Sequence, residues 1–221
     1  MTTRDPLRWH VVVPVKARAA SKTRLAPDER RPQLALAFAV DTMDAVAACP
    51  LVDSLVVVTD DADVTAAAVA VGAVVVPELD DPAVTGFARL NAAIRYGVEQ
   101  ANLGDARVAA LTADLPALQP EELARALTAA GAHPRAFVPD HEASGTSMLT
   151  ALRGAALAPE FGIASAAAHE KSGAIRLALS DVPGLRLDVD WQHDLIAVRK
   201  LRCGPATRAV LEAGGRGAND E

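Results

Sequence analysis

Positive charge gathers directly after an apolar run near the start of the chain. The run V-V-V-P-V occupies 11–15, and small residues separate the cations that follow it: Lys16, Arg18, Lys22 and Arg24. Small residues let a backbone approach a ligand closely. A polyphosphate needs this combination of accessible N–H groups and positive charge beyond a strand end. The loop therefore predicts a binding site for the phosphates of a nucleotide.

Three aspartates could supply a metal site. Asp114 follows an apolar run, and Pro116 makes the chain turn there. In L-D-V-D (187–190), alternation places Asp188 and Asp190 on one face, about 6–7 Å apart along the chain. Magnesium commonly uses one or two carboxylates together with substrate phosphates. A cationic loop and three carboxylates are the parts that nucleotidyl transfer needs, because the metal stabilises charge at the α-phosphate.

Each signal also has an ordinary structural interpretation. Cations after a strand are often a solvated surface. Asp114 could accept loop amides, and Asp190, four residues before Asp194, could be a helix N-cap. Asp188 is harder to explain in this way, because aspartate is disfavoured in strands. The metal-site interpretation depends on the signals occurring together at strand ends.

A second group of polar residues lies between 144 and 171. S-G-T-S (144–147) offers hydroxyls, and F-G-I-A-S (161–165) leads into an Ala-rich helical stretch. In one interpretation Ser165 is a helix N-cap and His169 an exposed surface residue. In the other, Thr146, Gly162 and Ser165 hold a small anion at a helix N-terminus, and His169 adds a donor from the same helix face. The remaining histidines lack ligand spacing and receive no role: His10, His133, His141 and His193.

The elements that must position these residues alternate along the chain. Apolar β-branched runs predict strands at 10–15, 54–59, 73–76, 108–112 and 136–138. Segments of helical composition lie at roughly 29–48, 63–71, 88–101 and 120–130. This alternation predicts an α/β fold with a mostly parallel, doubly wound sheet, whose ligands bind at the carboxyl ends of the strands.

The second half of the chain is less regular. We expect a loop or hairpin-rich insertion over 140–170, a short strand at 185–189 and a closing helix that begins over 194–201. A single domain is predicted over 1–213. The tail at 214–221 has no apolar pattern and is expected to be disordered.

Composition bears on partners and compartment. The net charge of −6 and pI near 5.4 argue against a general nucleic-acid binder. The first residues contain no apolar signal core, and no uncharged run is long enough to span a membrane. The two cysteines have no metal-like spacing and fit a reducing compartment. We therefore expect a cytoplasmic protein that acts on small molecules.

The motifs, taken in order, resemble one family. They are V-P-V-K-A-R-A-A-S-K-T-R-L-A-P (13–27), L-N-A-A-I (90–94), T-A-D-L-P-A-L (112–118), G-T-S-M-L (145–149), F-G-I-A-S-A-A-A-H (161–169) and L-D-V-D (187–190). This set is similar to the CofC/FbiD guanylyltransferases of coenzyme F-420 biosynthesis, over roughly 9–209. Members often have Thr-Pro where Trp191-Gln192 stand here, and some have Asn in place of Ser147.

The resemblance implies a three-layer nucleotidyltransferase (Rossmann-like) fold and Mg²⁺-dependent transfer of GMP from GTP. The actinobacterial branch implies phosphoenolpyruvate as the acceptor, with enolpyruvyl-diphospho-5′-guanosine and pyrophosphate as products. Other branches use 2-phospho-L-lactate or 3-phospho-D-glycerate. A homodimer is compatible with the sequence, and so is a transient contact with the transferase that consumes the labile product.

The resemblance also implies roles for individual residues. Those contacting phosphoenolpyruvate would be Thr146, Gly162 and Ser165, and the helix spacing adds His169 to this predicted substrate site. Those holding magnesium would be Asp114, Asp188 and Asp190. Those binding the nucleotide would be Pro14, Val15, Lys16, Lys22 and Asn91. Catalytic roles fall to Lys16, Lys22, Arg24 and Asp114, with the cations offsetting the charge of the triphosphate.

Two other classes of protein remain as alternatives. Guanylyltransferases acting on a molybdopterin or a sugar phosphate usually carry a G-G-x-S-x-R-M-G loop, and residues 11–25 contain no glycine. A nucleotide-binding sensor without turnover would not need to keep three aspartates. Release of pyrophosphate from GTP and an acceptor separates an enzyme from a sensor.

Overall fold

A computed structural model of the chain describes residues 8–16, 30–79, 81 and 83–216. Within them, seven strands form one sheet in the order β3-β2-β1-β4-β6-β5-β7. Four of its neighbouring pairs are parallel, whereas β6 is antiparallel to both β4 and β5. The strands are β1 (Trp9–Pro14), β2 (Val52–Val58), β3 (Val74–Val76), β4 (Arg107–Leu111), β5 (Arg135–Pro139), β6 (Thr146–Ala151) and β7 (Ile175–Arg176).

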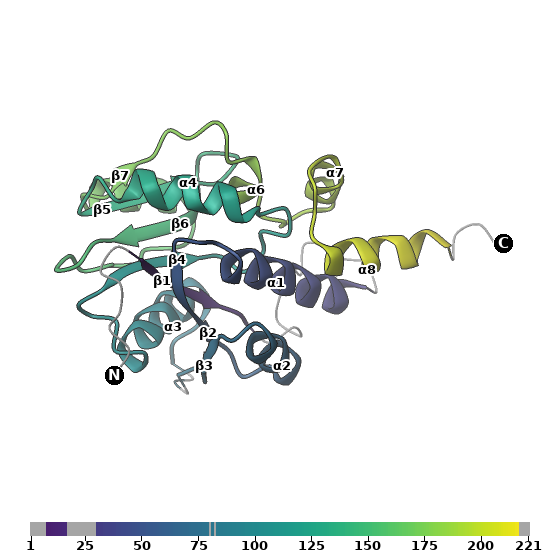
Figure 1. Cartoon of the computed structure of the whole chain (residues 1–221), viewed down its shortest axis with the longest axis horizontal. Helices are drawn as coiled ribbons and strands as arrows, with labels where there is room; N and C mark the ends of the chain where they lie inside the picture. Colours follow the sequence, from purple (N-terminus) through teal and green to yellow (C-terminus); the bar gives the residue numbers. More distant parts are fainter. Residues whose placement is uncertain (1–7, 17–29, 80, 82, 217–221) are drawn as a thin grey trace.

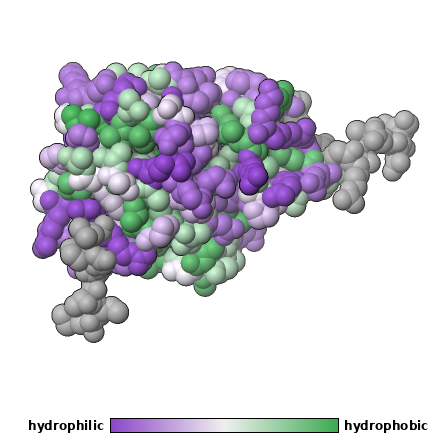
Figure 2. Space-filling view, turned by 45° about the horizontal axis from the view of Figure 1, so that its top comes forward, coloured by the Kyte–Doolittle hydropathy of each residue, from purple (hydrophilic) through white to green (hydrophobic). Residues whose placement is uncertain are grey.

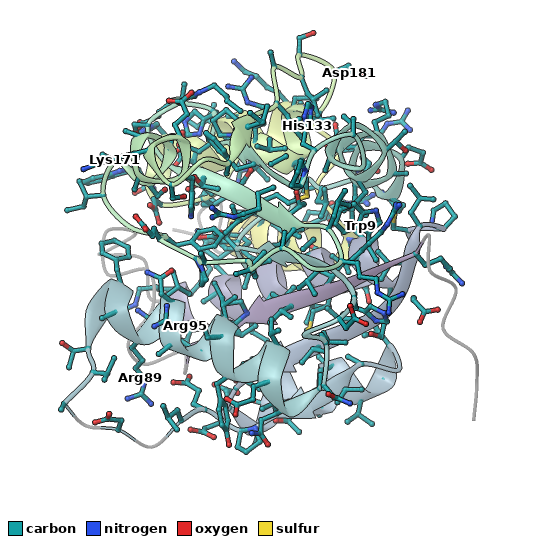
Figure 3. The ribbon with its side chains drawn as sticks, turned by 90° about the vertical axis from the view of Figure 1, so that its left-hand side faces the viewer. Trp9, Arg89, Arg95, His133, Lys171 and Asp181 are labelled. Carbon is teal, nitrogen blue, oxygen red and sulfur yellow. The ribbon has the colours of Figure 1, made fainter. Side chains whose placement is uncertain are left out.

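Helices cover both faces of this sheet (Figure 1). Alternate residues of β1 show why: Val11 and Val13 pack into one apolar core with α1, α2 and α4, whereas Val12 packs into another with α3 and α5. Figure 3 shows the second helix layer, with Arg89 and Arg95 on α3 and Lys171 on α5. The helices are α1 (Arg31–Ala47), α2 (Ala62–Ala70), α3 (Gly86–Gln100), α4 (Pro120–Ala130), α5 (Ser165–Lys171), α6 (Pro183–Arg186), α7 (Gln192–Lys200) and α8 (Pro205–Arg216).

The predicted alternation is confirmed through the first part of the chain. Strands β1 to β5 and helices α1 to α4 all lie where the patterns predict them. The three-layer, mostly parallel α/β architecture follows. A third, smaller core joins Leu34 and Phe38 of α1 to residues of the last helices, including Val198 of α7 and Leu211 of α8.

The predicted strand at 185–189 is wrong. Helix α6 ends at Arg186, and residues 187–190 are unpaired with any strand of the described chain. The apolar alternation nevertheless has a purpose, because Leu187 and Val189 are buried in the third core against Leu34 and Phe38. The alternating apolar side chains of this segment are therefore buried against helix α1 and not within the sheet.

The insertion expected over 140–170 contains a strand, β6, that pairs with β5 as a hairpin. Strand β6 could not be recognised from the sequence because it contains polar residues. Ser147 and Thr150 are buried, and their hydroxyls donate to the carbonyls of Val138 and Ala136 on the neighbouring strand. Helix α8 extends to Arg216, into the segment expected to be disordered, whereas residues 217–221 lie outside the described residues.

Among the described residues, no helix combines the length and apolarity needed to cross a membrane. Figure 2 shows hydrophilic and hydrophobic residues interspersed over one face of the molecule. Cys49 is buried and Cys203 half-buried, and both are free thiols.

Candidate active site

The central strand β1 delivers the first predicted site residues to the carboxyl edge of the sheet. The N–H of Val15 donates to the carbonyl of Val58 at 2.9 Å, which extends the parallel pairing one residue beyond Pro14. Val15 is buried and Lys16 is exposed, so the cationic side chain emerges at the strand end. The predicted roles of Lys22 and Arg24 fall outside the described residues.

The loop that carries Asp114 is anchored by a residue of α1. Thr42 is fully buried, and its hydroxyl accepts the N–H of Leu115 at 3.1 Å and lies 3.3 Å from the carbonyl of Ala113. The hydroxyl hydrogen of Thr42 also donates to the carbonyl of Phe38 at 2.8 Å, so the firmer anchor is the bond from Leu115, directly after Asp114. Sequence analysis missed this anchor because Thr42 is distant along the chain and sits within an ordinary helical pattern.

The segment 187–190 is fastened to the same loop. The N–H of Val189 donates to the carbonyl of Asp114 at 3.1 Å. Because Leu187 and Val189 are buried, the intervening Asp188 and Asp190 present their carboxylates away from that core. The structure thus brings the three predicted aspartates to one place.

Asp190 is not the N-cap of α7. The cap is Trp191, and Asp194 accepts the backbone N–H groups of Asp190 and Trp191 on Oδ2, at 2.9 and 2.7 Å. The helix therefore begins without the Thr-Pro pair common in the family. Capping does not explain the carboxylate of Asp190.

Negative charge is concentrated around Asp188. Burial, together with the nearby carboxylates of Asp114, Asp190 and Asp140, raises the pKa of its carboxyl to about 8. The buried Oδ1 of Asp188 accepts no hydrogen bond from the described residues, although His141 Nδ1 lies 3.5 Å away. Such a group of oxygens favours a cation.

The described residues contain no set of three His, Cys, Asp or Glu side chains already arranged around a metal position. Magnesium does not require one, because it usually keeps several waters and binds substrate phosphates beside one or two carboxylates. The carboxylate oxygens gathered around Asp188, one of them buried without a hydrogen bond, fit such an ion. The carboxylates are adjacent, and a phosphate ligand would complete the site.

Sequence analysis missed Asp140 and His141. Asp140 accepts the N–H of Ser144 on Oδ1 at 3.1 Å and that of Gly145 on Oδ2 at 2.7 Å, so it shapes the β5–β6 turn while facing Asp188. His141, given no role from the sequence, lies against Asp188 and Asp194. The rule that ligands gather at strand ends could have found both, because they follow a predicted strand directly.

The predicted acceptor residues also converge. Thr146 begins β6 immediately after the turn held by Asp140, and the N–H of Ala166 donates to the carbonyl of Ser144 at 3.1 Å. The start of α5 is thereby joined to this turn. Ser165 is buried and is not the N-cap, since Ala164 occupies that position with a φ of 55°.

His169 is not a surface residue. Its side chain is fully buried, with Nδ1 2.9 Å from the hydroxyl of Thr146 and Nε2 3.0 Å from the N–H of Glu160. Burial lowers the pKa of His169 to about 4, and the charge of Arg135 acts in the same direction. Both ring nitrogens are therefore used within the protein by a neutral imidazole.

Asn91, predicted to bind the nucleotide, contacts the acceptor side. Its Nδ2 donates to the carbonyl of Phe161 at 2.9 Å, and its Oδ1 accepts the N–H of Phe161 at 2.8 Å. Helix α3 thus holds the backbone just before Gly162. The predicted contact between Asn91 and the nucleotide stays a prediction.

Glu122 positions the aspartates indirectly. It is buried and accepts the N–H groups of Gly184 and Leu185 at 3.2 and 2.9 Å, which fixes α6 before the segment 187–190. We expect Glu122→Ala to lower the free energy of unfolding by about 2 kcal/mol, because two buried donors lose their acceptor. Urea unfolding measures this loss. Glu121→Ala, at the exposed neighbouring position, is the control, and equal losses in the two variants would contradict the assignment.

The pKa of His169 predicts a pH dependence of stability. Between about pH 4 and 6.5 the unfolded chain binds a proton that the folded chain excludes. The neutral His169 therefore causes no loss of stability above pH 6.5. As the pH falls below this value the free energy of unfolding decreases, by about 3 kcal/mol near pH 4. Urea unfolding of the wild type and His169→Gln across this range isolates the effect, because Asp188 titrates in both. Parallel stability curves would contradict it.

Comparison with known proteins places the chain in a family. The family model described as guanylyl transferase CofC like matches residues 9–202. A phosphoenolpyruvate guanylyltransferase of Streptomyces coelicolor is 49% identical over 209 residues, covering 92% of this chain and 96% of the relative. One of Salinispora arenicola is 50% identical over 204 residues, with 90% and 91% covered.

Solved structures agree on the fold. A nucleotidyl transferase from Methanothermobacter thermautotroptrophicus aligns with a TM-score of 0.58 at 18% identity, covering 87% of this chain and 96% of that one. A 4-diphosphocytidyl-2C-methyl-D-erythritol synthase gives the same TM-score at 17% identity, with 87% and 98% covered. The fold is that of nucleotidyltransferases, and the family match over most of the sequence is more specific. The chain belongs to the CofC-like guanylyl transferase family.

Proposed function

We propose that the chain transfers GMP from GTP to phosphoenolpyruvate and releases pyrophosphate. The observation that carries this proposal is the near 50% identity, over nine-tenths of the chain, to relatives named phosphoenolpyruvate guanylyltransferase. The site geometry supports it, because Asp140 joins the aspartate cluster to the turn that presents Thr146. By its family, the product would enter coenzyme F-420 biosynthesis.

The proposed reaction needs no general base. A phosphate oxygen of the acceptor is already anionic and attacks the α-phosphorus of GTP. The new phosphorus–oxygen bond forms as the bond to the bridging oxygen of the β-phosphate breaks, and pyrophosphate takes the electron pair. The protein must bring two polyanions together in line. Lys16, exposed at the end of β1, would offset the charge of the triphosphate.

Asp114, Asp188 and Asp190 would hold Mg²⁺ in this proposal. The support is their convergence through the bond from Val189 to Asp114 and the carboxylates gathered around Asp188. When bound, the ion supplies charge stabilisation at the α-phosphate and the leaving pyrophosphate. The protein's part is to hold the carboxylates close together.

Thr146→Val is expected to raise the KM for phosphoenolpyruvate about tenfold while leaving the KM for GTP within about twofold. The substitution removes one hydroxyl donor and keeps the shape of the side chain, and a hydrogen bond to a charged group contributes about 1.5–3 kcal/mol. Steady-state kinetics with each substrate varied in turn measures the split. Thr150→Val, in the same strand but bonded to Ala136, is the control. An equal rise in both constants would count against the assigned pocket.

Pyrophosphate release tests the acceptor. With Mg²⁺ and GTP, release should be fastest with phosphoenolpyruvate when that acid, 2-phospho-L-lactate and 3-phospho-D-glycerate are offered separately. A preference for another acid would overturn the acceptor and keep the chemistry. Folded protein that binds GTP and releases no pyrophosphate with any of them would favour a sensor.

A further inference from the structure

The imidazole of His169 connects two parts of the acceptor site. On one side, Nε2 lies 3.0 Å from the N–H of Glu160, just before the segment that contains Gly162. On the other side, Nδ1 lies 2.9 Å from Oγ1 of Thr146 at the start of β6. One ring therefore ties the loop before α5 to the strand that presents the threonine.

The backbone contact determines which nitrogen carries the proton. An amide N–H can only donate, so Nε2 of His169 must accept and is unprotonated. In a neutral imidazole the proton then resides on Nδ1. Nδ1–H therefore donates to Oγ1 of Thr146, and the hydroxyl is the acceptor in this bond.

The direction of this bond decides what Thr146 can offer a ligand. A hydroxyl that accepts from histidine still has its own hydrogen to donate. Among the described residues, the contact with His169 is the one side-chain hydrogen bond recorded for Oγ1. The threonine is thus prepared as a donor, which is the role that an anionic acceptor requires.

The surroundings of His169 fix the ring in this state. The side chain is fully buried, with the ring centroids of Phe137 and Phe161 at 5.8 and 5.3 Å. Burial and Arg135 keep the ring neutral above about pH 4. A change of tautomer would set two N–H groups against each other at Glu160, so the buried ring has one favourable arrangement.

We propose that His169 is a positioning residue that orients the hydroxyl of Thr146 as a hydrogen-bond donor to the anionic group of the acceptor. It acts through Thr146 and does not contact the substrate itself. The identity of the acceptor rests on the proposed function. The orientation of the hydroxyl does not, because it follows from the contacts of His169 alone.

Two amide substitutions separate the two bonds of the ring. The amide of His169→Asn reaches the position of Nδ1 and can still donate to Thr146, but it loses the contact with Glu160. The amide of His169→Gln reaches the position of Nε2, where its oxygen can accept from Glu160, but it leaves Thr146 without a donor. Both variants remove the imidazole, so they serve as each other's controls.

His169→Gln should raise the KM for phosphoenolpyruvate about tenfold, and His169→Asn should raise it clearly less, with the KM for GTP unchanged in both. In a Thr146→Val background, His169→Gln should add no further rise. Equal effects of the two amides, or a full further rise in the Thr146→Val background, would overturn the proposal. Thermal unfolding confirms that each variant is folded.

Nitrogen-15 NMR of the wild-type imidazole tests the orientation without any turnover. The resonances of His169 should show a proton on Nδ1 and a bare Nε2 at neutral pH. A proton on Nε2 would overturn the proposal, whichever acceptor the enzyme uses. If phosphoenolpyruvate is not a substrate but Nδ1 is protonated, the acceptor assignment fails and the role of His169 stands.

Discussion

Asp114→Asn and Asp190→Asn are each expected to lower kcat by about 10³-fold or more. Each amide removes one anionic oxygen donor from the proposed magnesium site and leaves the size of the side chain unchanged. The backbone bond from Val189 to Asp114 does not involve the altered atoms, so the fold should remain. Steady-state pyrophosphate release, with Mg²⁺ varied, measures the loss.

The control for these variants is Asp181→Asn. Asp181 lies in the same part of the chain but is exposed and pairs with Arg125 at 2.9 Å. Its kcat should stay within about twofold of the wild type, since an exposed ion pair contributes little. A folded Asp114→Asn or Asp190→Asn enzyme with near wild-type turnover would remove that carboxylate from the mechanism.

Gly162→Ala is expected to raise the KM for the acceptor by about 10- to 30-fold. Gly162 has a φ of +150°, and an added Cβ would lie 3.1 Å from Cγ of Phe87. Backbone strain of this kind costs about 1–3 kcal/mol, and the new methyl group must also displace the phenyl ring. The loop held by Asn91 and His169 would therefore shift relative to Thr146. Kinetics with the acceptor varied measures this effect.

Gly154→Ala separates strain from position. Gly154 has a φ of +80° and open space where its Cβ would be, so its substitution strains the backbone away from the site. Its stability should fall while its acceptor KM stays unchanged. Adding Phe87→Ala to Gly162→Ala should recover part of the loss, because it removes the contact with the phenyl ring and leaves that with Cβ of Phe87 at 3.3 Å. Matching kinetics for the two glycine variants would contradict this account of the loop.

The sequence was most informative where one local pattern determines the structure. Apolar β-branched runs and helical segments predicted β1 to β5 and α1 to α4. Strands that are buried on both faces of a sheet have continuous apolar sequences, which can be recognised locally. Asp188 and Asp190 were placed on one face for the right reason, although their segment is not a strand. Alternation buries Leu187 and Val189 against α1 just as it would within a sheet.

The rest depends on contacts between residues far apart in the chain. Thr42 anchors the Asp114 loop from α1, and Asp41 accepts the N–H groups of Ala206 and Thr207 at the start of α8. Neither partnership leaves a periodic signal. The burial of His169 was missed for the same reason, since its partners are Thr146 of strand β6 and Glu160 of the loop before α5.

Phosphorus-31 NMR of the complete reaction tests the central claim most directly. Protein, Mg²⁺, GTP and phosphoenolpyruvate are mixed, and the spectrum is followed over time beside an identical sample of Asp114→Asn. The account predicts a new pair of coupled diphosphate resonances appearing together with pyrophosphate, in the wild type alone. Pyrophosphate or orthophosphate accumulating without a new diphosphate would contradict it, because GTP would then be hydrolysed and not transferred to the acceptor.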